Sequence, residues 1–296
     1  MQGKILIVDT VATNRIVLKV KLSASFYDVA LVASANDALA HACVTKPDLI
    51  LASMDMPDNE AIMLCKALKS DVALRSAPVV MIAANDDHGM RIAAFSAGAD
   101  DVLSKPFDDE FLLARIRSLL RTRNAVDELR LRDGTSQALG FAEDIGTFDQ
   151  TGRVAVLSAD QINAARLAGQ LKPKFGSTIS HHEIKDAMGS FGESDVPEVF
   201  VILLDGVDAD LGLHLLSDIR AHASTRHASI IVLPSAKSHP KVAAAALDLG
   251  ANDVMPGSLA PLNLHYGSGR KSNANTQLID CVITCGTACR RRWLTR

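Results

Sequence analysis

Residues 97–107 read AGADDVLSKPF, and residues 249–259 read LGANDVMPGSL. Both stretches contain Gly, Ala, a polar residue, Asp, Val and an apolar residue in the same order, and Gly98 and Gly250 lie 152 residues apart (250 − 98). A repeat with so long a period predicts a duplicated domain, since solenoid repeats are much shorter. The copies differ after this core, because the first continues with Lys105 and Pro106 and the second has Gly257 and Ser258.

Each copy closes a series of short apolar runs that alternate with helical patterns. The runs of the first copy are KILIVD (4–9), VALVAS (29–34), DLILAS (48–53), PVVMIAA (78–84) and DVLSKP (101–106). Helical patterns lie near 14–22, 36–45, 59–69 and 88–97, and another begins at Asp108. Five strands that alternate with five helices predict an α/β fold with a doubly wound parallel sheet.

The same cycle restarts at Arg153. Its predicted elements are VAVLS (154–158), a helix over 159–171, STIS (177–180), VFVILLD (199–205), SIIVLP (229–234) and DVMP (253–256). We therefore predict two receiver-sized domains, residues 1–122 and 153–261, joined by a linker helix and loop over 123–152. Because residues 108–133 contain no Gly or Pro, we expect one helix there; about 24 helical residues would span about 36 Å, long enough to project beyond the first domain.

Residues 262–296 differ in composition from the rest of the chain, with six Lys or Arg against one acid. They stand where the second domain needs its fifth helix, so we predict that this domain is incomplete and that the tail is disordered or out of frame. Cys281, Cys285 and Cys289 recur every four residues and would share one face of a helix. The composition of the tail does not favour a metal site there, and the role of these cysteines stays open.

Composition excludes several classes of protein. Hydrophobic residues make up 48% of the chain and charged residues 22%, which is typical of a globular protein. The net charge of −3 argues against a nucleic-acid partner. No apolar run approaches the roughly 20 residues that span a membrane, and no signal sequence precedes KILIVD. We therefore expect a cytoplasmic protein without a membrane partner.

Three stretches carry a resemblance to a known family. KILIVD, LILASMDMP at 49–57 and AGADDVLSKPF resemble the receiver domain of two-component response regulators. LLARIRSLLRTRNAVDELRLRD at 112–133, followed by a second receiver-like copy, is similar to the PleD class, which carries two receivers ahead of a diguanylate cyclase domain. The resemblance covers residues 1–261. It implies the regulatory part of a phosphorelay regulator in cyclic-di-GMP signalling, a homodimer, and a histidine kinase or phosphotransfer protein as partner.

The resemblance also assigns positions to a phosphorylation site. A working receiver takes phosphoryl onto an aspartate after its third strand, next to Mg²⁺ held by that aspartate and a pair of acids, with a Ser or Thr and a Lys that contact the phosphate. In the first copy the corresponding residues are Asp9 and Thr10 for the acid pair, Ser53 for the acceptor, Ala83 for the switch and Lys105 for the lysine. Only one acid and the lysine remain of that set.

Two further interpretations concern this pocket. Asp55, two residues after Ser53, is the remaining acid that could join Asp9 at a Mg²⁺ ion, although a solvated loop acid is the preferred interpretation of it. Lys105 has two interpretations: a relic of the family site that would contact a phosphate, or, as we prefer, a structural residue that pairs with Asp9 across the pocket, because no acceptor aspartate is present. A serine without a base is a weak nucleophile, so we predict no catalytic residue.

The second copy departs further from the family pattern. Its acid-pair positions are Ser158 and Ala159, with Asp160 interpreted as a helix cap, and its acceptor position is Asp205. The switch position is Pro234, and Gly257 replaces the lysine. Both copies are therefore interpreted as pseudo-receivers. Histidines 181, 182 and 214 have no spaced Cys or His partners and are not predicted to bind metal.

Three hypotheses follow for the function. The first is a non-catalytic regulator whose receivers dimerise or dock, and the second is a diguanylate cyclase that has lost its catalytic domain, since no GGDEF or GGEEF occurs in the chain. The third is a flavodoxin-like module that binds a small ligand, which the absence of a glycine-rich loop after Asp9 disfavours. The sequence leaves the kinase, the signal and the dimer face open.

Overall fold

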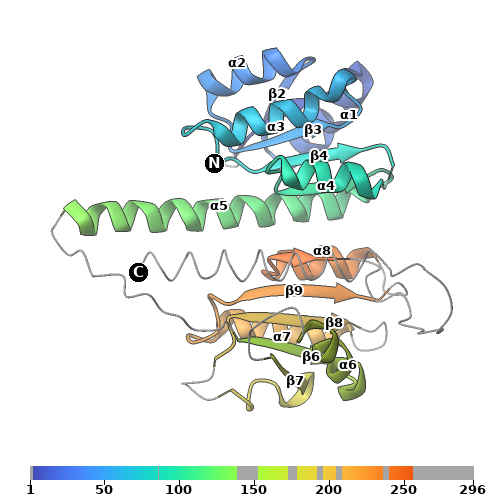
Figure 1. The fold of residues 1–296 in the computed structure, drawn as a ribbon, viewed down its shortest axis with the longest axis vertical. Helices are drawn as coiled ribbons and strands as arrows, with labels where there is room; N and C mark the ends of the chain where they lie inside the picture. The colour runs from blue at the N-terminus through green and yellow to red at the C-terminus, as the bar shows by residue number, and fades with distance from the viewer. Residues whose placement is uncertain are drawn as a thin grey trace. The chain divides into compact units, whose positions relative to one another are not determined.

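A computed structural model describes residues 3–85, 87–138, 153–172, 179–191, 196–204, 209–235 and 240–255 (Figure 1). The chain divides into two compact units, Met1–Asn124 and Ala125–Arg296. Among the described residues, no helix combines the length and the apolar character that a membrane span requires.

The first unit is built on a five-stranded parallel sheet in the order β2-β1-β3-β4-β5. The strands are β1 (Lys4–Val8), β2 (Asp28–Val32), β3 (Leu49–Ser53), β4 (Val79–Ala83) and β5 (Asp101–Ser104). Every residue of β3 and β4 is buried. This agrees with their unbroken apolar sequences, because a central parallel strand is covered on both faces.

Helices cover both faces of this sheet (Figure 1). They are α1 (Ala12–Ala24), α2 (Ala35–Thr45), α3 (Glu60–Ser70), α4 (His88–Ser96) and α5 (Asp109–Ala138), with a short 3-10 helix, η1 (Pro57–Asn59), before α3. Leu6 and Ile50 pack with α2, α3 and α4, whereas Ile5 and Leu51 pack with α1 and α5. Alternate residues of one strand thus serve two separate apolar clusters.

Helix α5 extends beyond the stretch 108–133 that lacks Gly and Pro, because it continues through Gly134 to Ala138. Its first half is held by ion pairs to three other elements. Asp109 Oδ1 lies 2.6 Å from Lys21 Nζ of α1, Arg115 pairs with Asp101 of β5, and Arg123 pairs with Asp48 before β3. A helix fixed over so many turns can absorb one internal glycine, which costs about 1 kcal/mol.

The second unit repeats the topology, with the strand order β10-β9-β8-β6-β7. Its elements are β6 (Val154–Ser158), α6 (Gln161–Leu171), β7 (Ile179–Glu183), the 3-10 helix η2 (Ile184–Asp186), β8 (Val199–Leu204), α7 (Ala209–Ala221), β9 (Ser229–Pro234), α8 (Pro240–Asp248) and β10 (Asp253–Val254). The prediction of two doubly wound five-stranded parallel sheets is confirmed. The tail, with its three cysteines, lies outside the described residues, so the prediction of an incomplete second domain stays a prediction.

The stretch repeated at residues 97–107 and 249–259 forms the same kind of contact in both units. In the first, Lys69 Nζ donates to the carbonyl oxygens of Arg75 (3.3 Å) and Ala77 (2.9 Å) and to Asp100 Oδ2 (2.6 Å). Asp100 Oδ2 also accepts from the backbone N–H of Val79 at 2.7 Å. A side chain at the end of α3 therefore ties the loop before β4 to the loop before β5. We call this set the Lys69 clamp.

In the second unit Arg220 of α7 occupies the place of Lys69. Its guanidinium donates to the carbonyl oxygens of Arg226 (2.8 Å) and Ala228 (2.7 Å) and to Asn252 Oδ1 (2.7 Å). It also donates twice to the Gly250 carbonyl oxygen, at 2.9 and 2.7 Å. We call this set the Arg220 clamp. It differs from the Lys69 clamp in its two side chains, because Arg220 and Asn252 take the places of Lys69 and Asp100.

Both glycines of the repeat are required by this contact. Gly98 has a φ of +96° and Gly250 has a φ of +110°. Residues other than glycine rarely adopt this backbone conformation. A Cβ at Gly98 would lie 3.0 Å from Lys69 Cγ, and one at Gly250 would lie 3.1 Å from Arg220 Nε. The repeated glycine therefore follows from the backbone and from the side chain packed against it.

Candidate functional site

The residues that the sequence singled out in the first unit lie at one edge of the sheet, where the strands end. Asp9 and Thr10 follow β1, Ser53 ends β3, Ala83 ends β4 and Lys105 follows β5. The pairing registers place Val8 beside Ala52, Ser53 beside Ile82, and Ala83 beside Ser104. We call this region the C-terminal edge, and it is where ligands bind in folds of this class.

Asp9 is 3% exposed and has both carboxylate oxygens engaged. Oδ1 accepts from the backbone N–H of Val11 at 2.8 Å, and Oδ2 accepts from Asn14 Nδ2 at 3.0 Å. Arg15 Nη1 donates to the carbonyl oxygens of Asp9 (2.6 Å) and Thr10 (3.1 Å). The start of α1 therefore satisfies this buried acid. Sequence reasoning missed Asn14 and Arg15, whose signal is their position in the first turn of the helix after β1.

Lys105 does not pair with Asp9, so that expectation is wrong. Its backbone N–H donates to the Ala83 carbonyl oxygen at 2.8 Å, and its peptide bond to Pro106 is cis. The half-buried side chain makes no hydrogen bond or ion pair with any residue that the structure describes. The ammonium group is therefore available at the C-terminal edge, while the acid it was expected to neutralise is satisfied by neutral donors.

Ser53 and Ala83, which the resemblance places at the acceptor and switch positions, are both buried. Ser53 is 2% exposed, and its Oγ accepts from the backbone N–H of Asp55 at 3.3 Å. Ala83 contributes only a buried methyl group. The side chain of Asp55 is exposed, as expected for a solvated loop acid. This edge thus offers a hydroxyl and a methyl group where a phosphorylation site needs a carboxylate and a hydroxyl.

The residues at the C-terminal edge do not fit a resident Mg²⁺ ion. Mg²⁺ demands octahedral oxygen coordination that includes one or two carboxylates. Here both oxygens of Asp9 already accept N–H donors, Thr10 stands in place of the second acid, and the Asp55 side chain is exposed to solvent. Within the described ranges, no three His, Cys, Asp or Glu residues cluster closely enough to hold a metal ion.

In the second unit a serine ends the first strand, β6, whereas in the first unit Ser53 ends the third strand. Ser158 is fully buried, and its Oγ accepts from the backbone N–H of Asp160 at 3.2 Å. Asp160 Oδ1 accepts from the N–H of Ile162 at 2.8 Å, which confirms Asp160 as the cap of α6. Pro234 ends β9 and is buried. Asp205 and Gly257 lie outside the described residues, so the interpretation of the acceptor position there stays untested.

The histidines of the second unit are in ordinary environments. The ring of His182 contacts that of Phe191 edge to face, with centroids 5.0 Å apart, and Phe191 contacts Phe200 in the same way at 5.5 Å. His181 lies on β7, and His214 lies on α7.

Comparison with known proteins adds three findings. The family described as Response regulator receiver domain matches residues 5–117. Response regulator PleD of Caulobacter vibrioides is 32% identical over 266 residues, 89% of this chain and 58% of that protein. The DNA-binding dual master transcriptional regulator RpaA of Synechocystis is 33% identical over 125 residues, 42% of this chain and 52% of that protein. The chain thus spans about half the length of these relatives.

Among solved structures, the signal receiver domain of a signal transduction histidine kinase from Syntrophus aciditrophicus is 32% identical. That match covers 40% of this chain and 91% of that one, with a TM-score of 0.39.

Proposed function

Residues 5–117 are a receiver domain of the response regulator family, and on that premise we propose that this chain is the regulatory part of a PleD-like phosphorelay regulator whose receivers act by docking and dimerisation and not by phosphoryl transfer. One observation carries the proposal. The acceptor position holds Ser53, a buried hydroxyl that accepts a backbone hydrogen bond, beside an Asp9 whose carboxylate is fully engaged.

The chemistry of phosphoryl transfer explains why this observation matters. Catalysis of that step comes mostly from positioning and from positive charge that offsets the phosphoryl oxygens. At the C-terminal edge the only cationic group of the family pattern is Lys105, and no metal-binding set accompanies it. A serine hydroxyl also needs a base, and the Asp9 oxygens are occupied by Val11 and Asn14. Phosphorylation at Ser53 is therefore not expected.

Apolar side chains on the outer face of α1 support a docking role. Ile16 is 59% exposed, Val20 is 63% exposed, and Val17 lies between them on the same helix. These residues fall on the face opposite Leu18 and Leu22, which pack into the core. A helix with apolar residues on both faces favours contact with another surface, either a second copy of the chain or a histidine kinase or phosphotransfer protein.

We propose no catalytic activity for this chain, which contains neither GGDEF nor GGEEF. If it operates in cyclic-di-GMP signalling, as the PleD resemblance implies, the synthesis of that nucleotide belongs to another polypeptide segment. The hypothesis of a cyclase that has lost its catalytic domain is tested by resequencing the native locus from codon 250 onward in all three frames. A frame that continues a helix and reaches GGDEF or GGEEF would replace our proposal.

The central test is phosphorylation of the full chain by acetyl phosphate with Mg²⁺, followed by intact mass measurement and peptide mapping. We expect no phosphoryl adduct within residues 1–135. The matched control is the double variant Thr10→Asp/Ser53→Asp, which restores the second acid and the acceptor and is expected to become phosphorylated at residue 53. An adduct on the unaltered chain in that segment would contradict the proposal.

Self-association is tested by gel filtration of the full chain with light scattering. We expect a dimer at micromolar concentration. If the α1 face forms the dimer contact, Val20→Glu should weaken the dimer. Lys66→Glu, which changes an exposed residue of α3, should leave the dimer unchanged. A chain that stays monomeric at high concentration would remove dimerisation from the proposal.

A further inference from the structure

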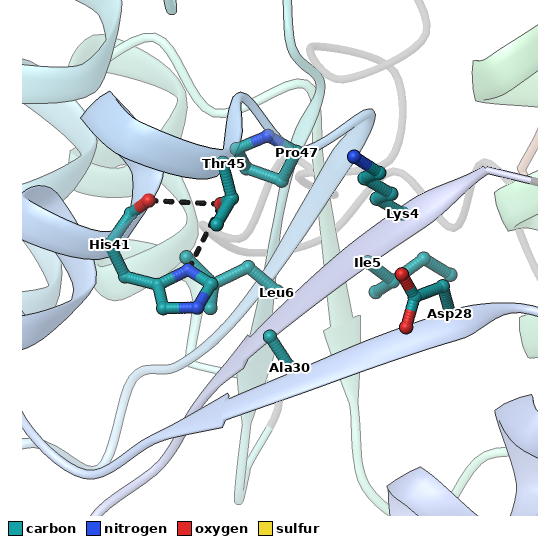
Figure 2. Close-up of a pocket in the computed structure, with 8 residues that line it drawn as sticks. All are labelled: Lys4, Ile5, Leu6, Asp28, Ala30, His41, Thr45 and Pro47. Atoms are coloured by element: carbon teal, nitrogen blue, oxygen red, sulfur yellow. Dashed lines mark hydrogen bonds between the residues drawn. The ribbon is translucent and has the colours of Figure 1, made fainter.

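A cavity of about 190 Å³ lies at the opposite edge of the first sheet, where the strands begin. Its floor comes from β1 and β2, and its wall comes from the second half of α2 (Figure 2). This edge is remote along the strands from the C-terminal edge, so the cavity is separate from the site described above. Nothing in the family pattern assigns a role to its residues.

The smallest side chain that lines the cavity is that of Ala30. Leu6 of β1 is registered with Ala30 of β2, and both face α2 together with Ala38 and Ala42. A methyl group at position 30 does not fill the space under the helix, so room remains between the sheet and His41. Floor and wall are therefore formed by apolar atoms and one imidazole ring, an environment that suits a small aliphatic group.

The mouth of the cavity carries two opposite charges. Lys4 of β1 lies opposite Asp28 of β2. Each stands two residues before Leu6 or Ala30 on its strand, so both lie on the same face of the sheet as Leu6 and Ala30. Both are exposed, and they form no ion pair with each other. Neither side chain has a hydrogen-bond partner among the residues that the structure describes. Asp48, which accepts from the backbone N–H of Lys4, is already engaged by Arg123.

The wall adds a hydrogen-bond acceptor. Thr45 Oγ1 donates to the His41 carbonyl oxygen at 2.9 Å and lies 3.0 Å from His41 Nδ1. A hydroxyl group has only one proton to donate. Both contacts are therefore satisfied when Nδ1 carries the ring proton and donates to Oγ1, a tautomer assigned from this hydrogen-bond pattern. Nε2, the other ring nitrogen, is then an acceptor on a ring that lines the cavity (Figure 2).

We propose that this cavity binds a free α-amino acid with a small aliphatic side chain. The ligand carboxylate lies at the Lys4 ammonium group, the ligand ammonium lies at the Asp28 carboxylate, and the side chain lies over Leu6 and Ala30 toward the His41 ring. The volume of about 190 Å³ suits a ligand smaller than those of drug size, whose pockets measure about 300–1,000 Å³. Adjacent groups of opposite charge exclude a simple anion, which Asp28 would repel, and match the two charges of a zwitterion.

The test uses the full chain, labelled with ¹⁵N, and titrations with L-alanine, L-valine and L-leucine followed by the shifts of amide signals. At least one of these amino acids is expected to shift signals of residues 4–6, 28–30 and 41–45 in a saturable manner. Two compounds provide ligand controls, because isopentylamine lacks the carboxylate of leucine and 4-methylpentanoate lacks its ammonium group. Both are expected to bind at least tenfold more weakly than leucine.

Variants separate this site from general surface effects. Lys4→Met and Asp28→Asn are each expected to weaken binding at least tenfold, and Ala30→Leu is expected to fill the cavity and abolish it. Lys66→Met, which removes an exposed lysine of α3, serves as the matched control and should leave the affinity unchanged. The spectrum of each variant shows whether it is folded. The proposal is overturned if none of the three amino acids gives saturable shifts, if 4-methylpentanoate binds as well as leucine, or if folded Lys4→Met keeps the affinity.

Discussion

Replacement of Arg220 by lysine tests whether the Arg220 clamp holds the second unit together. The guanidinium group makes five hydrogen bonds, two of them to the Gly250 carbonyl oxygen. Lysine has three donors on one nitrogen. The Lys69 clamp of the first unit shows that an ammonium group can serve three acceptors in this geometry. We therefore expect Arg220→Lys to keep three contacts and to lose both bonds to Gly250.

The magnitude follows from those two bonds. A hydrogen bond from a charged donor contributes about 1.5–3 kcal/mol, and two bonds to one carbonyl oxygen do not add fully. We expect Arg220→Lys to lower the free energy of unfolding by about 2–3 kcal/mol. Adding Asn252→Asp supplies the ion pair seen between Lys69 and Asp100. The double variant is expected to recover about 1 kcal/mol, since the equivalent pair is only partly buried.

The assay must follow each unit separately, because a chain of two units need not unfold in one step. Hydrogen exchange in increasing urea, read by mass spectrometry on peptides that cover β9 and β10, reports the stability of the second unit. Peptides of β1 and β3 serve as the internal control, and Asn252→Asp alone shows the effect of the new charge with arginine present. Unchanged exchange in Arg220→Lys, or a double variant no more stable than Arg220→Lys, would refute this account of the repeat.

Three further predictions concern the first unit. Gly98→Ala is expected to cost about 1–3 kcal/mol because it forces a side chain into φ of +96° against Lys69, and urea unfolding of that unit would measure it; a neutral effect would contradict the strain. Burial raises the pKa of the Cys65 thiol to about 11, so this thiol stays protonated at pH 8. Iodoacetamide should therefore modify the exposed Cys43 before Cys65, and equal rates of modification in peptide mass spectra would contradict this. Arg115→Met leaves Asp101 buried without its partner and is expected to cost about 3–5 kcal/mol in the same urea experiment, whereas Asp101→Asn/Arg115→Met should cost less.

Strand positions could be predicted from the sequence because parallel strands read as apolar runs. VAVLS and SIIVLP match β6 and β9 at both ends. The repeated Gly–Ala–polar–Asp–Val stretch predicted the duplication for a reason now visible, since its glycine and polar residue belong to the clamp of each unit. The local sequence was sufficient to predict an element where the fold accepts only one kind of residue. Strands buried on both faces of a sheet accept apolar residues, and positions with positive φ accept glycine.

The contacts of Asp9 could not be predicted in the same way. Charge alone suggested Lys105 as its partner, but the N–H of Val11 and the amide of Asn14 are closer in sequence and reach the carboxylate first. The continuation of α5 through Gly134 could not be predicted from the local sequence, because the ion pairs that hold the first half of this helix come from residues distant in the chain. The cavity near Ala30 also escaped prediction, because it depends on the β1–β2 register and not on any motif.

The unbroken helix α5 makes the chain sensitive to length as well as to composition. Its first turns are fixed by partners in the first unit, and the helix continues past residue 124 to Ala138. One residue inserted there would rotate the following residues of α5, up to Ala138, by about 100° around the helix axis and advance them by about 1.5 Å. An insertion of seven residues would restore nearly the same rotational phase. The number of residues in α5 after Arg123 therefore sets the direction in which the last turn of this helix faces around its own axis.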